Sequence, residues 1–314
     1  MNFPFIEDFK GKKITIIGDI MLDHYIFGKT NRISPEAPVP IVGVQNEKTT
    51  LGGSGNVIKN VSNLGADVDV ICIVGDDNPG KEIINKLNIA KISQEFVLKV
   101  KGLTTTRKMR IISNNQHVVR VDWDSKIHNI DNEKMFTNIQ KSILGSSALL
   151  ISDYAKGVCT NKIVENSIKY ARESNIPIFI DPKGINWSKY SGSDYITPNL
   201  KEVKEVLNIP INSEIDIIKS AKKIKNDYNI KCCLITRGSD GMTIVNNSGS
   251  KNIKTVAKEV FDVSGAGDTV IACFTLAKIC GLSDFKAANF ANYAAGIVVG
   301  HLGTEPINLS ELED

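Results

Sequence analysis

Short runs of β-branched and other apolar residues alternate along the chain with longer segments in which apolar positions recur every three to four residues. The short runs predict strands and the longer segments predict helices. Strands are expected at 13–18, 68–74, 148–152, 176–181, 195–197 and 232–236, and helices at 55–64, 79–87, 162–174, 201–207 and 215–228. Strands separated by helices of this length imply βαβ units. We therefore predict an α/β fold with three layers, α/β/α, around a mostly parallel central sheet.

Two segments depart from this rhythm. Residues 25–44 contain Pro35, Pro38 and Pro40 and alternate polar with apolar positions, and residues 104–121 alternate in the same way. Alternation of this kind is typical of antiparallel strands that are half exposed. We expect the two segments to pair into a small β-lid beside the main sheet, built from about 20–45 and 100–122. No repeat, low-complexity tail or linker divides the chain, so a single domain over 1–314 is expected.

Composition narrows the class of protein. The chain has 314 residues, 42% of them hydrophobic, and 38 Lys and Arg against 35 Asp and Glu give a formal net charge of +3. Because basic and acidic residues are interleaved, a nucleic-acid partner is not expected. The first 13 residues lack the apolar core of a signal peptide, and no run approaches a membrane span. The six cysteines form no C-x-x-C pair and read as free thiols, so we expect a cytoplasmic protein without a membrane partner.

The segment 262–269, Asp-Val-Ser-Gly-Ala-Gly-Asp-Thr, carries the clearest chemistry. Its small residues allow a sharp turn, and the apolar run 270–276 after it predicts a buried helix. A helix that begins there would present free N–H groups to a groove, which makes an anion site. Asp268 beside such a site suggests a base that takes a proton while a phosphoryl group is transferred nearby.

Other polar loops follow the predicted strands, and ligands of parallel sheets bind beyond the carboxyl ends of strands. These loops are 19–23, 153–157, 181–184, 199–202, 236–241 and 262–268, and they are expected to converge. Two standard nucleotide motifs are excluded. Gly28-Lys29-Thr30 lacks the first glycine of a Walker A loop, and neither glycine-rich segment has the third glycine of a dinucleotide fingerprint.

Four features suit a polyhydroxyl ligand. Asp19 and Asp23 follow the first strand, and carboxylates accept hydrogen bonds from vicinal hydroxyls. The turn at Gly52 and Gly53 brings the backbone close to a ligand, and the amide of Asn56 both donates and accepts. The alternatives are solvated loop acids and a turn that merely caps a helix.

Asn199 and Glu202 form a capping box, which is compatible with a second task of ordering Mg²⁺-bound phosphates through water. The loop 236–241 offers N–H groups and a hydroxyl, or is only a tight turn between strands. Lys156 and Lys183 are basic residues on ligand-side loops, although surface lysines usually have no function.

Arg110 and Arg120 share one face of the predicted lid strands. Their guanidinium groups are suited to grip a substrate phosphate through paired hydrogen bonds. A basic strand edge that only discourages aggregation is an equal alternative. The histidines show no metal-ligand spacing.

Residues 52–56 and 262–268 are similar to the two signatures of the ribokinase (PfkB-type) carbohydrate kinases, and the resemblance covers nearly the whole chain. It implies a ribokinase-like fold and the use of ATP and Mg²⁺. Val263 and Ser264 stand where Thr and a variable residue are common. The resemblance is greatest to the kinases of ADP-heptose synthesis, over 18–23, 32–40, 115–120, 152–157 and 294–304.

These kinases phosphorylate D-glycero-D-manno-heptose 7-phosphate at C1 on the way to lipopolysaccharide core, and an adenylyltransferase often follows them in the same chain. No second domain is expected within 1–314. A kinase of another sugar, sugar phosphate or nucleoside is the alternative. The resemblance also makes a homodimer formed through the β-lid an expectation.

By resemblance, Asp268 is the catalytic base, and Gly265, Ala266 and Gly267 form the anion hole. The candidate cofactor-binding residues are Asn199, Leu200, Lys201, Glu202, Thr236, Gly238, Gly241 and, near adenine, Asn289 or Asn292, of which Asn292 is carried forward. The candidate substrate-binding residues are Asp19, Asp23, Gly52, Gly53, Asn56, Arg110, Lys156 and Lys183. No residue is assigned as a direct metal ligand, because Glu202 is expected to act through water.

Overall fold

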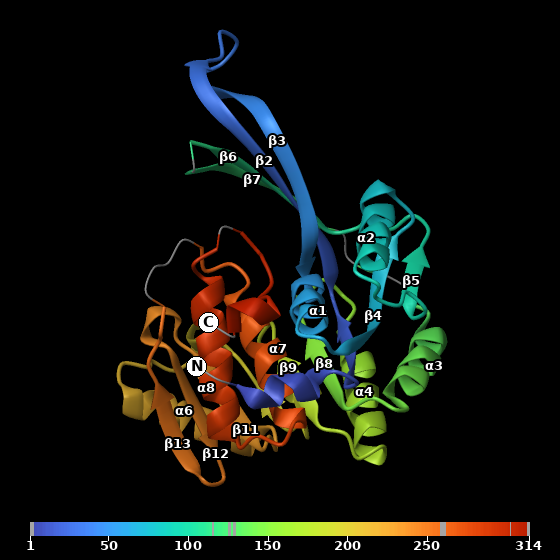
Figure 1. The fold of residues 1–314 in the computed structure, drawn as a ribbon, viewed down its shortest axis with the longest axis vertical. Helices are drawn as coiled ribbons and strands as arrows, with labels where there is room; N and C mark the ends of the chain where they lie inside the picture. The colour runs from blue at the N-terminus through green and yellow to red at the C-terminus, as the bar shows by residue number, and fades with distance from the viewer. Residues whose placement is uncertain are drawn as a thin grey trace.

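The computed structural model describes residues 3–114, 116–124, 127, 130–257, 262–301 and 303–312. Within these residues, nine strands form a central sheet in the order β13-β12-β11-β10-β9-β8-β1-β4-β5 (Figure 1). Neighbours from β11 to β5 run parallel, and β12 and β13 add an antiparallel edge. The strands are β1 Lys13–Gly18, β4 Asp67–Gly75, β5 Val97–Val100, β8 Ala148–Ser152, β9 Ile178–Asp181, β10 Tyr195–Ile196, β11 Cys232–Thr236, β12 Met242–Asn246 and β13 Gly249–Ile253. The predicted α/β/α class is therefore confirmed.

Helices cover both faces of the sheet. The helices are α1 Ser54–Asn63, α2 Asn78–Ile89, α3 Asn132–Ile143, α4 Asn161–Glu173, α5 Leu200–Leu207, α6 Glu214–Asp227, α7 Ala266–Ile279 and α8 Asp284–Val298. One hydrophobic core lies under α1, α2, α7 and α8, and a second lies under α3, α4, α5 and α6. Successive strand residues serve opposite cores, as Ile16 and Ile17 of β1 do, because side chains alternate across a sheet.

Two helices were not predicted. In α8 the buried residues include Ala287, Ala288, Phe290, Ala291 and Ala294, which leave little contrast between its faces. Helix α3 buries only Met135, Ile139, Ser142 and Ile143 and is otherwise polar. Periodicity is a weak signal when a helix is apolar nearly all round or has a narrow apolar stripe.

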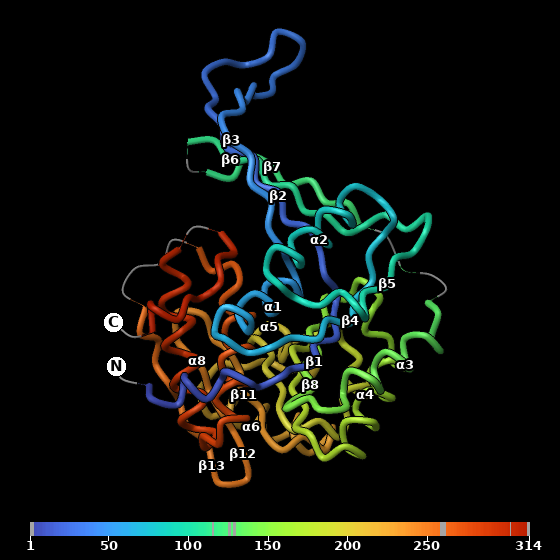
Figure 2. Tube along the Cα trace, turned by 45° about the vertical axis from the view of Figure 1, so that its right-hand side comes forward, coloured from blue at the N-terminus to red at the C-terminus, as the bar shows by residue number. Residues whose placement is uncertain are grey.

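A second, four-stranded sheet projects from the main body, as Figures 1 and 2 show from two directions. Its order is β3-β2-β6-β7, and its strands are β2 Ile20–Ile33, β3 Pro40–Gly53, β6 Arg107–Ser113 and β7 Gln116–Trp123. We refer to these four strands as the small sheet. The hairpins β2–β3 and β6–β7 are antiparallel, but the central pair β2–β6 is parallel. The expectation of antiparallel pairing throughout was wrong here, because β2 and β6 both leave the main body in the same direction.

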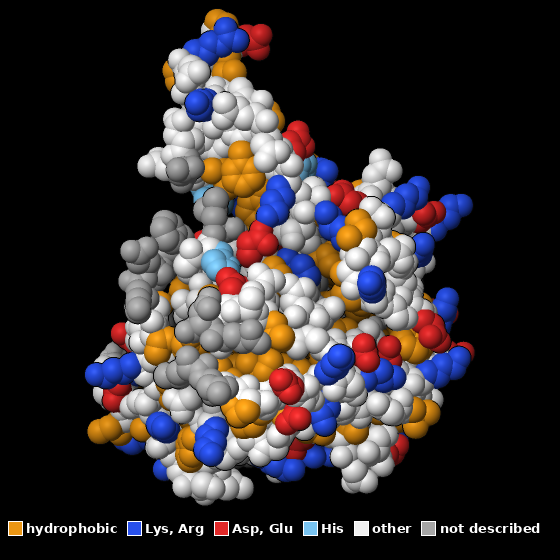
Figure 3. All heavy atoms as spheres, viewed as in Figure 1, with side chains coloured by type: hydrophobic (Ala, Val, Ile, Leu, Met, Phe, Trp, Pro, Cys, Tyr) orange, Lys and Arg blue, Asp and Glu red, His pale blue; other side chains and the backbone are white. Residues whose placement is uncertain are grey.

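The surface carries mixed charge. On the face shown in Figure 3, basic and acidic side chains are interspersed over the main body. Among the described residues, no helix combines the length and apolar content needed to cross a bilayer. All six cysteines are free, and five of them are buried. Asn115 and Leu302, which belong to two segments that carried the family resemblance, lie outside the described residues.

Candidate active site

A cavity of about 620 Å³ opens at the carboxyl ends of β8, β9, β10 and β11, beside the beginning of α7. It is the place where an open α/β sheet binds ligands. The candidates that line it are Lys183, Asn199, Glu202, Thr236, Gly238, Gly241, Gly265, Ala266, Gly267, Asp268 and Asn292. Six loops far apart in the sequence were expected to meet, and all but the loop 19–23 contribute residues to this lining.

Asp268 lies in the first turn of α7 and is 6% exposed. Its Oδ1 accepts a hydrogen bond of 2.6 Å from the hydroxyl of Tyr154, and its Oδ2 accepts one of 2.9 Å from the amide of Asn56. Burial raises the pKa of Asp268 to about 6, although both hydrogen bonds favour the ionised form. A carboxylate with such a pKa is suited to accept a proton near neutral pH.

Gly265 precedes α7 with φ +84°, a conformation that favours glycine. A Cβ at Gly265 would also lie 2.5 Å from Nδ2 of Asn56, so the position has no room for a side chain. The first N–H groups of a helix have no acceptor within it. Because Gly265, Ala266 and Gly267 line the cavity, this end of α7 offers partial positive charge to a bound anion.

The capping box at the start of α5 is complete. Glu202 N–H donates to Oδ1 of Asn199 over 2.9 Å, and Asn199 N–H donates to Oε2 of Glu202 over 3.0 Å. The other carboxylate oxygen of Glu202 accepts from Nζ of Lys183 over 2.7 Å. Leu200 packs against the core and the Lys201 side chain is 85% exposed, and neither lines the cavity. Of the four candidates in this segment, the structure therefore brings only Asn199 and Glu202 to the cavity.

The loop after β11 also lines the cavity. Thr236 ends β11, and Gly238 and Gly241 have φ of +60° and +82° in the turn to β12. Asn292 lines the cavity and donates to the backbone oxygen of Lys254 over 2.9 Å. Asn289 and Asn292 both line a second groove, but of the two only Asn292 also lines this cavity.

Four carboxylates line the cavity: Asp153, Asp181, Glu202 and Asp268. Burial raises the pKa of Asp181 well above its usual range, and the negative charges of Asp268 and Glu202 raise it further. A bound cation would relieve this repulsion, and carboxylate oxygens are the donors that Mg²⁺ prefers. Asp19, Asp153 and Cys159 also lie close together, but both carboxylates already have hydrogen-bond partners.

Asp19 has a different position from the expected one. Its Oδ2 accepts from the backbone N–H groups of Tyr154 and Lys156 over 2.9 and 3.1 Å, and its Oδ1 accepts from that of Val158 over 2.9 Å. The residue is 2% exposed and does not line the main cavity. These hydrogen bonds hold the loop after β8, and a contact of Asp19 with the sugar stays a prediction. Nothing in the sequence distinguished a loop acid from a buried one.

Asp23 of β2 and Arg110 of β6 form an ion pair of 2.6 Å between neighbouring strands of the small sheet. Gly52 lies so close that a Cβ there would overlap the Asp23 carboxylate, and Gly53, with φ +58°, leads directly into α1. Asp23 is among the charges that raise the pKa of Asp268, so the ion pair is near the base. These residues and Asn56 lie outside the lining of the main cavity, on the side of Asp268 toward the small sheet.

Basic residues gather between the small sheet and the loop after β8. Burial lowers the pKa of Lys108, and the positive charges of Lys156 and Arg110 lower it further against the opposing effect of Asp23. Lys156 also pairs with Asp124 over 2.6 Å. Arg120 lies directly opposite Arg110 in the β6–β7 pair but is 58% exposed. The expected shared face is present, but only Arg110 of the two is directed toward Asp23.

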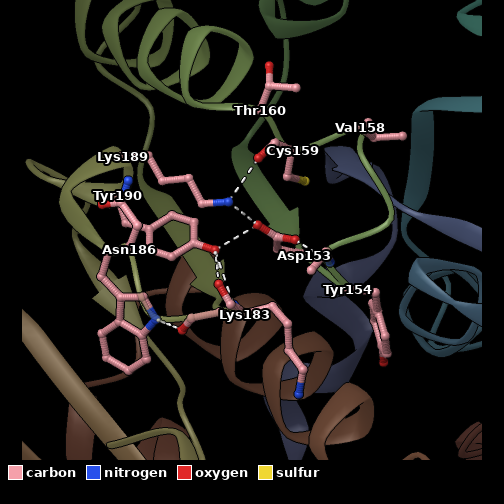
Figure 4. Close-up of polar contacts among 12 residues, drawn as sticks. Asp153, Tyr154, Val158, Cys159, Thr160, Lys183, Asn186, Lys189 and Tyr190 are labelled. Carbon is pink, nitrogen blue, oxygen red and sulfur yellow. Dashed lines mark hydrogen bonds and ion pairs between the residues drawn. The ribbon is translucent and has the colours of Figure 1, made fainter. Parts of the chain in front are cut away.

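Residues that the sequence reasoning missed cluster after β8. Figure 4 shows that Asp153 accepts from Lys189 and from the hydroxyl of Tyr190, the latter over 2.7 Å. The same hydroxyl accepts from the N–H of Lys183 over 3.1 Å, which links two cavity loops. Tyr154 was also missed, although its loop had been selected for Lys156. A tyrosine next to an aspartate gives no signal in sequence that its hydroxyl reaches a third loop.

A three-layer α/β fold with a projecting small sheet, and a buried aspartate at a helix N-terminus over a large cavity, define a sugar kinase of the ribokinase type. The chain belongs to the pfkB family of carbohydrate kinases, whose profile matches residues 12–311. This confirms the family that the two glycine-rich signatures indicated.

Proteins of similar sequence support this family assignment. The chain is 42% identical over 306 residues to the bifunctional protein HldE of Aliarcobacter butzleri (strain RM4018), and the match covers 96% of this chain and 64% of that protein. It is 41% identical over 311 residues to the bifunctional protein HldE of Haemophilus influenzae (strain PittEE), covering 99% and 64%. The chain thus spans less than two thirds of the length of these relatives.

Solved structures share the fold. Phosphofructokinase-2 from Escherichia coli in complex with potassium superposes with a TM-score of 0.79 at 18% identity, over 96% of this chain and 97% of that one. Arabidopsis thaliana ribokinase complexed with ribose and ATP gives 0.76 at 18% identity, over 97% and 98%.

Proposed function

We propose that the protein transfers the γ-phosphoryl group of ATP to the C1 hydroxyl of D-glycero-D-manno-heptose 7-phosphate. The product is heptose 1,7-bisphosphate, a precursor of ADP-heptose and lipopolysaccharide core. The observation that carries the reaction type is Asp268, buried at the N-terminus of α7 on the wall of the large cavity. The choice of sugar is supported by about 40% identity to HldE proteins over nearly the whole chain.

Asp268 takes the proton of the C1 hydroxyl as the hydroxyl oxygen attacks the γ-phosphorus. The bond from that phosphorus to the bridging oxygen breaks, and ADP leaves. The N–H groups at the start of α7 stabilise charge on the group in transit, and losing one such donor typically costs about 3 kcal/mol. A well-placed general base contributes on the order of a hundred- to ten-thousandfold in rate.

Mg²⁺ would be held near Asp181 and Glu202, with Glu202 and Asn199 ordering its water shell. When bound, it supplies charge neutralisation of the β- and γ-phosphates. Thr236, Gly238, Gly241 and Asn292 line the wall available to the nucleotide. Lys183, paired with Glu202, also lines the cavity and suits a contact with phosphate oxygens rather than with the sugar.

The substrate's own phosphate would be held from the small sheet. Arg110, Lys108 and Lys156 are within electrostatic reach of one another, which favours an anionic sugar over a neutral one. Asp23, Asn56 and the Gly52–Gly53 turn lie beside Asp268 and suit the sugar hydroxyls.

A substrate panel with ATP tests the proposal. Phosphorylation of heptose 7-phosphate should exceed that of ribose, fructose, adenosine and fructose 6-phosphate by at least tenfold in kcat/KM. A clear preference for an unphosphorylated sugar or for adenosine would reject the heptose assignment while keeping the kinase class. No ATP-dependent transfer to any acceptor would reject the reaction itself.

The proposal includes a homodimer in the cytoplasm. Val118, Val119 and Val121 of β7 and Val44 of β3 are exposed on the small sheet, and the projecting sheet of Figure 3 displays apolar side chains. Such a surface suits pairing with a second copy. A Val119→Lys variant should sediment as a monomer where the unaltered protein sediments as a dimer. Free cysteines and the need for ATP support the cytoplasm as its location.

A further inference from the structure

Both carboxylate oxygens of Asp268 are already hydrogen-bonded. Asn56 donates to Oδ2 over 2.9 Å, and the hydroxyl of Tyr154 donates to Oδ1 over 2.6 Å. A general base needs a carboxylate oxygen within about 2.6–3.2 Å of the group it deprotonates. Asp268 is only 6% exposed, and Tyr154, which lines the cavity beside it, occupies one of its two carboxylate oxygens.

The backbone of Tyr154 is held firmly. Its N–H donates to Oδ2 of Asp19 over 2.9 Å, and the next residue, Ala155, has φ +56° and donates its N–H to Asp153 over 2.7 Å. The ring faces the small sheet, where Nζ of Lys108 lies 6.0 Å from its centroid. With the backbone held in this way, departure of the hydroxyl from Asp268 requires rotation of the side chain and not rearrangement of the loop.

We propose that Tyr154 caps the catalytic base: its hydroxyl occupies the place on Oδ1 that the sugar's hydroxyl takes, and so denies Asp268 to water until a sugar displaces it. The inference rests on the proposed kinase function. The cap suppresses hydrolysis of ATP when no sugar is bound. In that side reaction a water oxygen bonds to the γ-phosphorus, ADP leaves with the electron pair of the broken bond, and the water proton passes to Asp268.

The alternative is a tyrosine that only orients the carboxylate. The two roles predict different results for Tyr154→Phe, which keeps the ring and removes the hydroxyl. Loss of a cap raises ATP hydrolysis without sugar, on the order of tenfold for one hydrogen bond to a charged group. Loss of an orienting contact lowers sugar phosphorylation and leaves hydrolysis at the level of the unaltered protein.

Tyr190→Phe is the matched control. Tyr190 donates to the carboxylate of Asp153 over 2.7 Å, so it too is a tyrosine hydrogen-bonded to an aspartate. Figure 4 shows that Tyr154 points away from the cluster that Tyr190 and Asp153 form. This variant should lose some stability and should not hydrolyse ATP faster. A second control, Tyr154→Phe combined with Asp268→Asn, should return hydrolysis to the background rate, because the uncapped base is gone.

The measurement is ADP release from Mg·ATP without sugar, in a coupled assay, with thermal melting to verify folding. A folded Tyr154→Phe protein that phosphorylates sugar but hydrolyses ATP no faster than the unaltered protein overturns the cap. Faster hydrolysis that persists in the double variant also overturns it. If the phenylalanine variant does not fold, Tyr154→Leu is read by the same criteria. If the unaltered protein phosphorylates no sugar in the panel, the proposed function is rejected. The hydrolysis assay contains no sugar, so the two failures can be told apart.

Discussion

Asn56 in α1 donates a hydrogen bond of 2.9 Å to Asp268 in α7, across 212 positions of sequence. One turn further along α1, Asn60 accepts a hydrogen bond of 3.2 Å from the hydroxyl of Thr269, the residue after Asp268. Gly265, before α7, has no room for a Cβ because Asn56 lies against it. The two glycine-rich segments therefore lie against each other, and contacts between the first turns of α1 and α7 hold both in place.

Asp268→Asn should abolish turnover and preserve nucleotide binding. The asparagine keeps the size of the side chain and can still accept from Tyr154, but it cannot take a proton. We expect kcat to fall on the order of a thousandfold or more, within the range for loss of a general base. The dissociation constant for Mg·ATP, measured by calorimetry, should change less than threefold. Asp67→Asn, an exposed residue at the start of β4, is the control and should leave both values unaltered. Near-normal turnover in Asp268→Asn would remove Asp268 from the role of base.

The activity of the unaltered protein should fall on the acid side of about pH 6. Burial raises the pKa of Asp268 to about 6, and only the ionised carboxylate accepts a proton. The profile of kcat/KM against pH should therefore lose a factor of ten per pH unit below that point. An acid limb at pH 4, the ordinary range of an aspartate, would contradict the role of burial.

The raised pKa of Asp268 also affects the stability of the folded protein. Between its usual pKa of 3.8 and about 6, the folded state binds more protons at Asp268 than the unfolded state does. The contribution of this residue to stability is therefore greatest at low pH and declines as pH rises through this window. At pH 8, Asp268→Asn should be more stable than the unaltered protein by about 1–3 kcal/mol, since each pKa unit corresponds to about 1.4 kcal/mol. Urea denaturation at pH 4 and pH 8 measures the difference, which should shrink at the lower pH.

Gly265→Ala should damage the site more than its backbone strain alone explains. Gly281, at the other end of α7, has a similar φ of +86° but open space around it. Gly281→Ala should cost about 1–2 kcal/mol from conformation and leave activity intact. Gly265→Ala should carry that cost and also displace Asn56, so kcat should fall by on the order of a hundredfold. Equal activity in the two variants would show that the contact with Asn56 has no catalytic consequence.

Arg110→Met should weaken both folding and substrate binding. It leaves Asp23, whose side chain is 3% exposed, without its cation. Breaking a fully buried pair costs about 3–5 kcal/mol, and the partial exposure of Arg110 reduces the expected loss to about 1–3 kcal/mol. The KM for the phosphosugar should rise more than tenfold. Arg120→Met, directly across the hairpin on an exposed side chain, should change neither quantity. A double-mutant cycle with Asp23→Asn measures the pair itself.

Local patterns were sufficient for the strands and helices with strong periodicity. The predicted bounds of β1, β8 and β11 coincide with the observed ones, because each is a short, largely apolar run limited by a polar residue or glycine. The capping box of α5 was also predicted, since Asn199 and Glu202 interact over three residues and need no distant partner. Apolar α8 and the parallel β2–β6 pairing were not predicted, because each depends on which neighbours cover it.

The sequence by itself determined the family, the fold class and the base candidate, because small residues before an apolar helix fix a local backbone shape wherever they occur. Only the tertiary structure decided which polar side chains meet. It buried Asp19 under three backbone N–H groups, paired Asp23 with Arg110, and brought Tyr154 and Asn56 to Asp268. The physical reason is that burial and hydrogen bonding depend on positions in space, and residues 87 or more positions apart come together only when the chain is packed.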